Sequence, residues 1–201
     1  MPSPFGHALA GLATAWAGGR LHLRVWGLAV SCAILAAAPD LDLLLPGAHR
    51  TFTHSIVAAV IVTIIAIVVT GKVTGKVDVR TGLLCGAAYG SHLLMDLLGA
   101  DPNPPSGIQL LWPARVWVIS PWTMFPGTER RHMLTVESFE TNVKAVLVEC
   151  AVMIPIAAAA WLTRRYRNRA RSSGPGSPRP PSAARVDTAG TSDRQARTEA
   201  H

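Results

Sequence analysis

The chain has 201 residues, a formal net charge of +7 and a mean hydropathy of +0.29. Its charged fraction of 15% lies below the roughly 25% typical of a soluble domain, which argues against an ordinary soluble protein. Residues 164–201 hold nine Arg and three acidic residues, so this stretch carries +6 of the charge. A short Arg-rich tail without interleaved aromatic residues indicates no nucleic-acid partner.

Five apolar segments follow one another along the chain, over residues 7–18, 25–38, 54–69, 81–98 and 143–162. A helix needs about 20 residues to cross the hydrocarbon core, so the first segment is short and the last is the clearest spanning candidate. The Ile, Val and Ala run of the third segment is longer than most strands and contains no turn residues, which favours a helix. We therefore predict an all-α, polytopic membrane helix bundle with four to five membrane segments.

Basic residues predict the topology of this bundle. They gather between the first and second segments, between the third and fourth, and after the fifth. Five alternating crossings place all three groups on one side, which the positive-inside rule assigns to the cytoplasm. The connections over residues 39–53 and 99–142 then lie on the extracytoplasmic side, and the C-terminus is cytoplasmic.

Two regions differ in composition. We expect residues 1–165 to form the membrane-embedded domain. Residues 166–201 are rich in Ser, Pro, Gly and Arg, cannot bury a core, and are predicted to be a disordered basic cytoplasmic tail. The Arg residues at the start of the tail either anchor the topology or bind anionic lipid heads.

His and Asp residues collect at the predicted extracytoplasmic ends of the segments. The topology used only Lys and Arg, so this common location is an independent observation. The residues are His7, Asp40, Asp42, His49, His54, His92 and Asp96.

His92 and Asp96 are the most informative pair. They stand four residues apart in an apolar segment, so on a helix they project from one face. An ionisable pair in a membrane helix is costly and usually marks a site. The alternative is a local hydrogen bond that ties down a helix end.

The motif PDLD places two carboxylates directly after a helix-breaking proline. Pro39 is expected to end the second helix, so that Asp40 and Asp42 lie in a loop where both can reach one cation. The alternative is a solvated turn at a helix end.

The motif HRTFTHS groups polar residues ahead of a very apolar helix. Thr53 is the predicted N-cap of the third helix, with His54 in its first turn and His49 in the preceding loop. An ordinary polar turn is the alternative. Arg50 in the same motif is suited to hold an anionic group such as a phosphate.

A set rich in imidazoles and carboxylates, without thiolates, suits a divalent metal: zinc first, with manganese or iron as alternatives. The predicted metal ligands are His7, Asp40, His49, His54, His92 and Asp96. The candidate catalytic residues are Asp42, Arg50 and His54. Such a metal lowers the pKa of bound water towards about 7 and supplies hydroxide for hydrolysis, with a spare carboxylate as general base.

The long connection contains three Trp residues in the stretch LLWPARVWVISPW. Trp favours the membrane–water interface, so this loop is expected to lie on the outer leaflet, either as a lid or as an interfacial belt. His132, Glu137 and Glu140 follow and could add to the site, although their spacing is uninformative.

The motifs GHALAGL, PDLD, HRTFTHS, SHLLMD and GIQLLWP follow in this order within residues 5–162. Together they resemble the YdjM-type family of bacterial inner-membrane proteins, LexA-regulated in some bacteria and described as metal-dependent hydrolases. The resemblance implies a multi-pass protein of the bacterial cytoplasmic membrane, with the seven His and Asp residues as its conserved polar set. One departure from the family is the stretch GADPNPPSG, which is longer than the usual connection before GIxLLWP.

The sequence thus predicts a membrane-bound metal-dependent hydrolase with its active site at the extracytoplasmic face. A site at the depth of lipid heads favours a phosphoester or other lipid-linked substrate, with membrane lipid as the surrounding partner. One alternative is a non-enzymatic metal-binding or transport protein, for which ligands along the bilayer depth are expected. The other is a structural membrane protein whose polar cluster pins helix ends.

Overall fold

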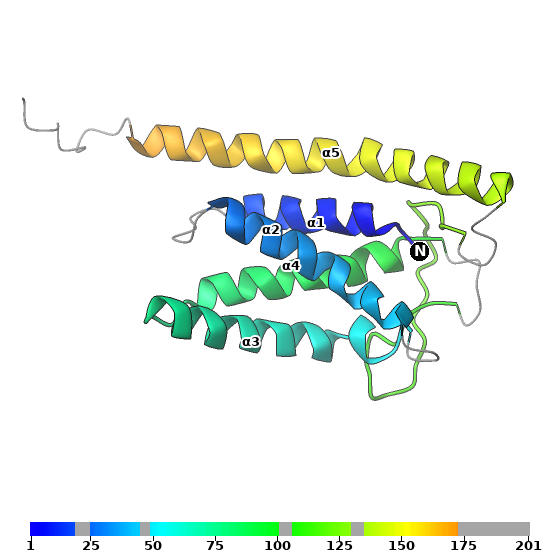
Figure 1. The fold of residues 1–201 in the computed structure, drawn as a ribbon, viewed down its shortest axis with the longest axis horizontal. Coiled ribbons are helices and arrows are strands. Elements are labelled where there is room, and N and C mark those ends of the chain that lie inside the picture. Colours follow the sequence, from blue (N-terminus) through cyan, green and yellow to red (C-terminus); the bar gives the residue numbers. More distant parts are fainter. Residues whose placement is uncertain (19–24, 45–48, 101–105, 130–134, 173–201) are drawn as a thin grey trace, which may run out of the picture. The chain divides into compact units, whose positions relative to one another are not determined.

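The structure is a computed structural model that describes residues 1–18, 25–44, 49–100, 106–129 and 135–172 (Figure 1). Regular structure in these residues is helical, with no strands, as predicted. The elements are α1 (Pro4–Ala17), α2 (Val25–Ala37), the 3-10 helices η1 (Ala38–Leu44) and η2 (Phe52–His54), α3 (Ile56–Thr74), α4 (Val79–Leu97) and α5 (Val136–Ser172).

Three helical stretches in the described residues are long and apolar enough to cross a membrane. They are Trp26–Leu44, which combines α2 with η1, Ile56–Thr74 of α3 and Val136–Ala170 of α5. Most residues of α3 remain exposed although they are apolar, as expected of a helix that faces lipid. The 14 residues of α1 extend only about 21 Å, less than the hydrocarbon core of a bilayer. These features are those expected of a helical membrane protein.

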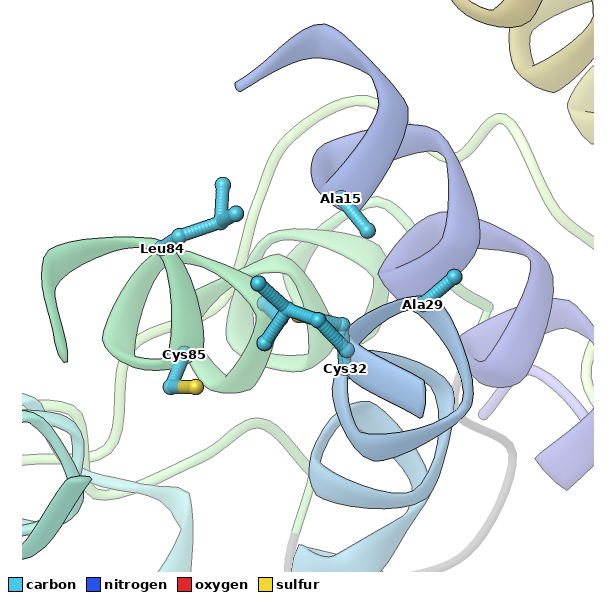
Figure 2. Packing of buried hydrophobic residues seen from close by; sticks show 7 residues of the cluster. Ala15, Ala29, Cys32, Leu84 and Cys85 are labelled. Atoms are coloured by element: carbon cyan, nitrogen blue, oxygen red, sulfur yellow. The ribbon is translucent and has the colours of Figure 1, made fainter. Parts of the chain in front are cut away.

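Helix α4 is the centre of the packing, since it contacts α1, α2 and α3, while α1 also packs on α2. Small side chains let these helices approach closely. Figure 2 shows the apolar cluster that they form, which comprises Ala15, Leu28, Ala29, Cys32, Leu84, Cys85 and Ala88. A Cβ on Gly11 of α1 would collide with the backbone carbonyl of Cys32 in α2. Close backbone approach of this kind is typical of membrane helices.

The start of α3 differs from the prediction. Ser55, not Thr53, is the N-cap: its hydroxyl accepts a hydrogen bond from the backbone N–H of Ala58 at 3.2 Å. His54 therefore ends η2, two residues before α3 begins at Ile56. The Thr53 hydroxyl is engaged elsewhere, because it donates to Asp42.

The PDLD segment also differs from the prediction. The α-helix α2 ends at Ala37, just before Pro39, as predicted. The chain then continues as the 3-10 helix η1 and does not enter a loop. Pro lacks the N–H for an α-helical bond, and a tighter i→i+3 turn accommodates it. Asp40 and Asp42 are thus carried on regular structure and are buried.

Helix α5 is longer than the predicted segment at both ends, and it continues through the Arg residues up to Ser172. Its length of about 55 Å exceeds the thickness of the hydrocarbon core. Residues 166–172 of the predicted tail are thus helical, and residues 173–201, where we predict disorder, lie outside the described part of the chain.

The connection between α4 and α5 is irregular over residues 106–129 and folds back onto the other helices. The backbone N–H groups of Ala100 and Met124 donate to the carbonyls of Phe125 and Leu98 at 2.8 and 2.7 Å. This connection covers the end of the bundle where α1 and α3 begin and α4 ends (Figure 1).

Candidate metal centre

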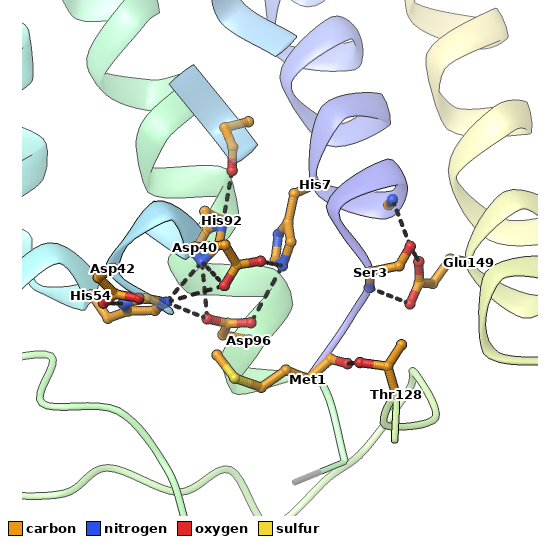
Figure 3. A network of polar contacts seen from close by, with 12 residues as sticks. Met1, Ser3, His7, Asp40, Asp42, His54, His92, Asp96, Thr128 and Glu149 are labelled. Atoms are coloured by element: carbon orange, nitrogen blue, oxygen red, sulfur yellow. Dashed lines mark hydrogen bonds and ion pairs between the residues drawn. The ribbon is translucent and has the colours of Figure 1, made fainter. Parts of the chain in front are cut away.

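Helix α4 supplies the first two side chains of the site. His92 and Asp96 point in the same direction, with 3.1 Å between His92 Nε2 and Asp96 Oδ2, and both side chains are buried (Figure 3). His92 Nδ1 lies 2.7 Å from the carbonyl oxygen of Ala36. A carbonyl only accepts, so Nδ1 carries the proton and Nε2 presents a lone pair to the site.

Helix α1 brings His7 to the same point. Its Nε2 lies 3.4 Å from Asp96 Oδ1, and its ring stacks on His92 with a centroid distance of 3.7 Å. His7 is completely buried. Within the described residues, neither nitrogen of its ring has a hydrogen-bond partner of good geometry, and the same holds for both Asp96 oxygens. Buried polar atoms in this state indicate that an additional group belongs at the site.

His54 arrives from η2 and completes a set of three imidazoles. Its Nε2 lies 3.0 Å from His92 Nε2 and 3.3 Å from Asp96 Oδ2. On the other side of the ring, Nδ1 faces Asp42 Oδ2 at 3.2 Å and the Thr53 hydroxyl at 3.0 Å. Thr53 gives its proton to Asp42, so both neighbours accept and Nδ1 is the protonated nitrogen.

Asp40 of η1 closes the cluster from the other side. Its Oδ1 lies 3.7 Å from His54 Nε2 and 3.9 Å from His92 Nε2, and its Oδ2 lies 4.0 Å from His7 Nε2. Three Nε2 atoms and two carboxylates therefore converge on one buried volume.

The short distance between His54 Nε2 and His92 Nε2 calls for a positive charge at this point, either a proton or a metal cation. Two unprotonated nitrogens 3.0 Å apart repel each other unless a proton or a cation lies between them. Two buried carboxylates beside them favour a cation. His7, His92 and Asp96 offer ligand atoms within 4.8 Å of one another, and so do Asp40, His49 and His54. The residues thus fit a divalent metal with nitrogen and oxygen ligands.

The electrostatic field at His54 favours a positive charge. Burial acts to lower the pKa of this imidazole, but contacts with Asp40 and Asp42 and the charge of Asp96 raise its pKa to about 9. A negative potential that retains a proton on His54 also attracts a metal cation, which must displace that proton in order to bind.

A second layer lies behind His54. Asp42 Oδ1 pairs with His49 Nδ1 at 2.6 Å, and Asp42 Oδ2 accepts from the Thr53 hydroxyl and from the backbone N–H of Arg50 at 3.3 Å. His49 is partly exposed, unlike the other imidazoles of the site. Both Asp42 oxygens are occupied, and this arrangement favours a role for Asp42 in orienting His54.

Arg50 is buried and its backbone has a positive φ of 66°, which is uncommon for a residue with a side chain. Its Nε donates to the sulfur of Met1 at 2.9 Å, and its carbonyl accepts from the Gln109 N–H at 3.1 Å. The conformation is therefore held by contacts on both sides. Strained backbone of this kind often occurs at functional sites.

A cavity of about 680 Å³ borders Asp96 on the side of the long connection. Its walls include Met1, Ile108, Val118 and Thr123. Its size falls within the range of small-molecule pockets, and Asp96 is the residue that it shares with the buried cluster.

The motif GIQLLWP packs directly on HRTFTHS. The Leu110 carbonyl accepts from the N–H of Ile56 at 3.0 Å, and the rings of Phe52 and Trp112 meet edge to face at 5.0 Å. Trp122 in the same connection is exposed. This contact holds the connection against the start of α3.

Of the three extra candidates in the connection, Glu137 and Glu140 are exposed on α5, and His132 lies outside the described residues. A different acidic residue, Glu149, was missed by the sequence analysis. It is completely buried in the middle of α5. The signal was present, because an ionisable side chain inside an apolar segment is the same feature that singled out His92.

These features define a helical membrane protein with a buried His and Asp centre at one end of its bundle. The chain belongs to the YdjM inner membrane protein family, whose model matches residues 1–168. The match covers every residue of the centre and confirms the resemblance seen in the sequence. No curated protein and no solved structure matches the chain.

Proposed function

We propose that this protein is a membrane-bound metal-dependent hydrolase with its active site at the extracytoplasmic face. The observation that carries the proposal is the convergence of three imidazole Nε2 atoms on Asp40 and Asp96, with only 3.0 Å between those of His54 and His92. Such a set favours a catalytic centre over a closed structural one, since structural zinc sites rely largely on thiolates.

His7, His54, His92, Asp40 and Asp96 would hold the ion, zinc first and manganese or iron as alternatives. His49, also predicted as a ligand, offers a ligand atom near those of Asp40 and His54, but its Nδ1 is paired with Asp42. When bound, the metal supplies an activated water for hydrolysis. Asp42 would keep the lone pair of His54 directed inward. His49, partly exposed and paired with Asp42, has access to solvent for proton exchange.

The substrate is proposed to be a phosphoester or another lipid-linked molecule. The cavity beside Asp96 has mostly apolar walls and is lined in part by the connection that carries exposed Ile119 and Trp122, so it is suited to an amphiphile at the membrane surface. Arg50 remains the candidate for an anionic substrate group, provided that its side chain leaves the Met1 sulfur.

Membrane placement is part of the proposal. The chain would lie in the bacterial cytoplasmic membrane as a multi-pass protein with a cytoplasmic C-terminus. α1 and α4 would span together with the three more apolar candidate spans, their polar ends covered by protein. The basic residues of the connections support this orientation.

Elemental analysis tests the proposal. Detergent-purified protein, dialysed against a weak chelator, should retain near-stoichiometric zinc, manganese or iron. The double variant His92→Ala/Asp96→Ala should lose both the metal and any hydrolysis of phosphoester or lipid substrates. Asp78→Asn is the matched control, because it alters a carboxylate that caps the opposite end of α4.

The outcomes separate the alternatives. Wild-type protein that binds none of these ions, even when each is supplied, would favour the structural role. Bound metal without hydrolysis of any such substrate would favour metal binding or transport. Hydrolysis that persists in the double variant would refute the assigned site.

A further inference from the structure

Glu149 forms a buried contact that the proposed chemistry does not use. It stands in the middle of α5, within an otherwise apolar stretch, and its side chain is directed at the first turn of α1 (Figure 3). A carboxylate inside a membrane helix is costly and is rarely retained without a function.

Both oxygens of this carboxylate are engaged by one residue. Glu149 Oε1 accepts from the backbone N–H of Ser3 at 2.7 Å, and Oε2 accepts from the Ser3 hydroxyl. Ser3 is itself the N-cap of α1, since its Oγ accepts from the Gly6 N–H at 3.2 Å. The negative charge thus lies at the positive end of the α1 dipole, where it is stabilised.

The glycine at position 6 of α1 leaves room for this contact. A Cβ on Gly6 would collide with the Glu149 carboxyl group, so a larger residue there would push the two helices apart. His7 follows immediately, and its N–H donates to the Ser3 carbonyl at 3.2 Å. Ser3, which Glu149 holds by two hydrogen bonds, therefore lies one helical turn before His7 of the centre.

We propose that Glu149 is a positioning residue for the metal centre: by holding Ser3, it fixes the first turn of α1 and thereby aims His7 Nε2 at Asp96. This inference rests on the proposed metal centre but not on hydrolysis. If Glu149 merely attached α5 to the bundle, its loss would reduce stability without acting through His7.

A double-mutant cycle separates these roles. Zinc affinity would be measured by competition with a chelating dye for wild type, Glu149→Ala, His7→Ala and the double variant. Glu149→Ala should weaken binding roughly 10–100-fold, the usual effect of losing a group that orients a ligand. In the His7→Ala background, the same change should have no further effect. Glu140→Ala, an exposed carboxylate on the same helix, should bind as wild type does.

Co²⁺ substitution provides an independent readout. The visible spectrum of Glu149→Ala should shift towards that of His7→Ala, because both variants lose a well-placed imidazole. If Glu149→Ala does not fold, Glu149→Gln carries the test. It keeps the side-chain shape and one acceptor, so its affinity should lie between wild type and the loss seen for His7→Ala.

Unchanged zinc affinity in a folded Glu149 variant would overturn the inference, and so would an equal loss in both backgrounds. Either result would leave the metal centre intact. Wild-type protein without metal would overturn the centre as well.

Discussion

At the scale of single residues, Asp42 joins several groups that lie behind the metal centre. It contacts His49, His54 and Thr53 and the backbone of Arg50. Groups that fix the tautomer and direction of a ligating imidazole raise metal affinity although they do not touch the ion.

Asp42→Asn tests this role. The amide replaces one acceptor oxygen with a donor, so His54 Nδ1–H loses a partner and its Nε2 lone pair is less firmly directed. Zinc affinity should fall roughly 10–100-fold, whereas His92→Ala/Asp96→Ala should abolish binding. The measurement is dye competition, with Asp78→Asn as the control that loses a cap but not a site residue. An unchanged affinity would show that Thr53 alone orients His54.

Residue chemistry explains what the sequence could predict about this site. Helical spacing is enough to bring His92 and Asp96 together, because the interaction lies within one element. The contact between Ser3 and Glu149 joins residues 146 positions apart, and no periodic pattern encodes such a distance. The occupation of both Asp42 oxygens likewise depends on how η1 and η2 meet in three dimensions.

At the scale of helices, two glycines differ in the space that surrounds them. Gly11 of α1 lies against the backbone of Cys32, which cannot move aside, whereas Gly27 of α2 has open space where a Cβ would be. The first is required by packing and the second is not.

Gly11→Ala should therefore destabilise the protein by about 1–3 kcal/mol, the usual effect of overpacking. Gly27→Ala should leave stability unchanged or raise it by about 0.4–1 kcal/mol, since alanine restricts the unfolded chain. Thermal unfolding in detergent, with Gly27→Ala as the matched control, measures both effects. A Gly11→Ala protein as stable as wild type would contradict the close approach of α1 and α2.

Helix ends were predicted less well than helices. Thr53 and Ser55 are both residue types that cap helices well. In the structure the Thr53 hydroxyl donates to Asp42, and the Ser55 hydroxyl caps α3. Pro39 excludes an α-helical bond but not a 3-10 turn, so the sequence could not distinguish a loop from η1.

At the scale of the whole molecule, the His and Asp residues share one end of the bundle because α1 and α3 begin there while α2 and α4 end there. The alternation of the segments was enough to predict this. The number of membrane crossings could not be predicted in the same way, because α1 is shorter than a bilayer core and its burial depends on the neighbouring helices.

Reporter fusions test the orientation. A reporter that is active only in the cytoplasm should work when fused after Lys76, between α3 and α4. One that is active only outside the cytoplasm should work when fused within residues 99–142. The reverse pattern would place the metal centre on the cytoplasmic side and overturn the proposed orientation.

The origin of the candidate ligands in α1, η1, η2 and α4 has a consequence for biogenesis. A chain emerging from the ribosome holds no complete donor set until residues 92 and 96 have been synthesised and α4 has inserted beside α1. Metal loading would therefore be a late event in assembly. The ion would then act as a cross-link that joins the first helix to the fourth, and metal starvation would leave a fully synthesised but loosely joined bundle for membrane proteases to remove.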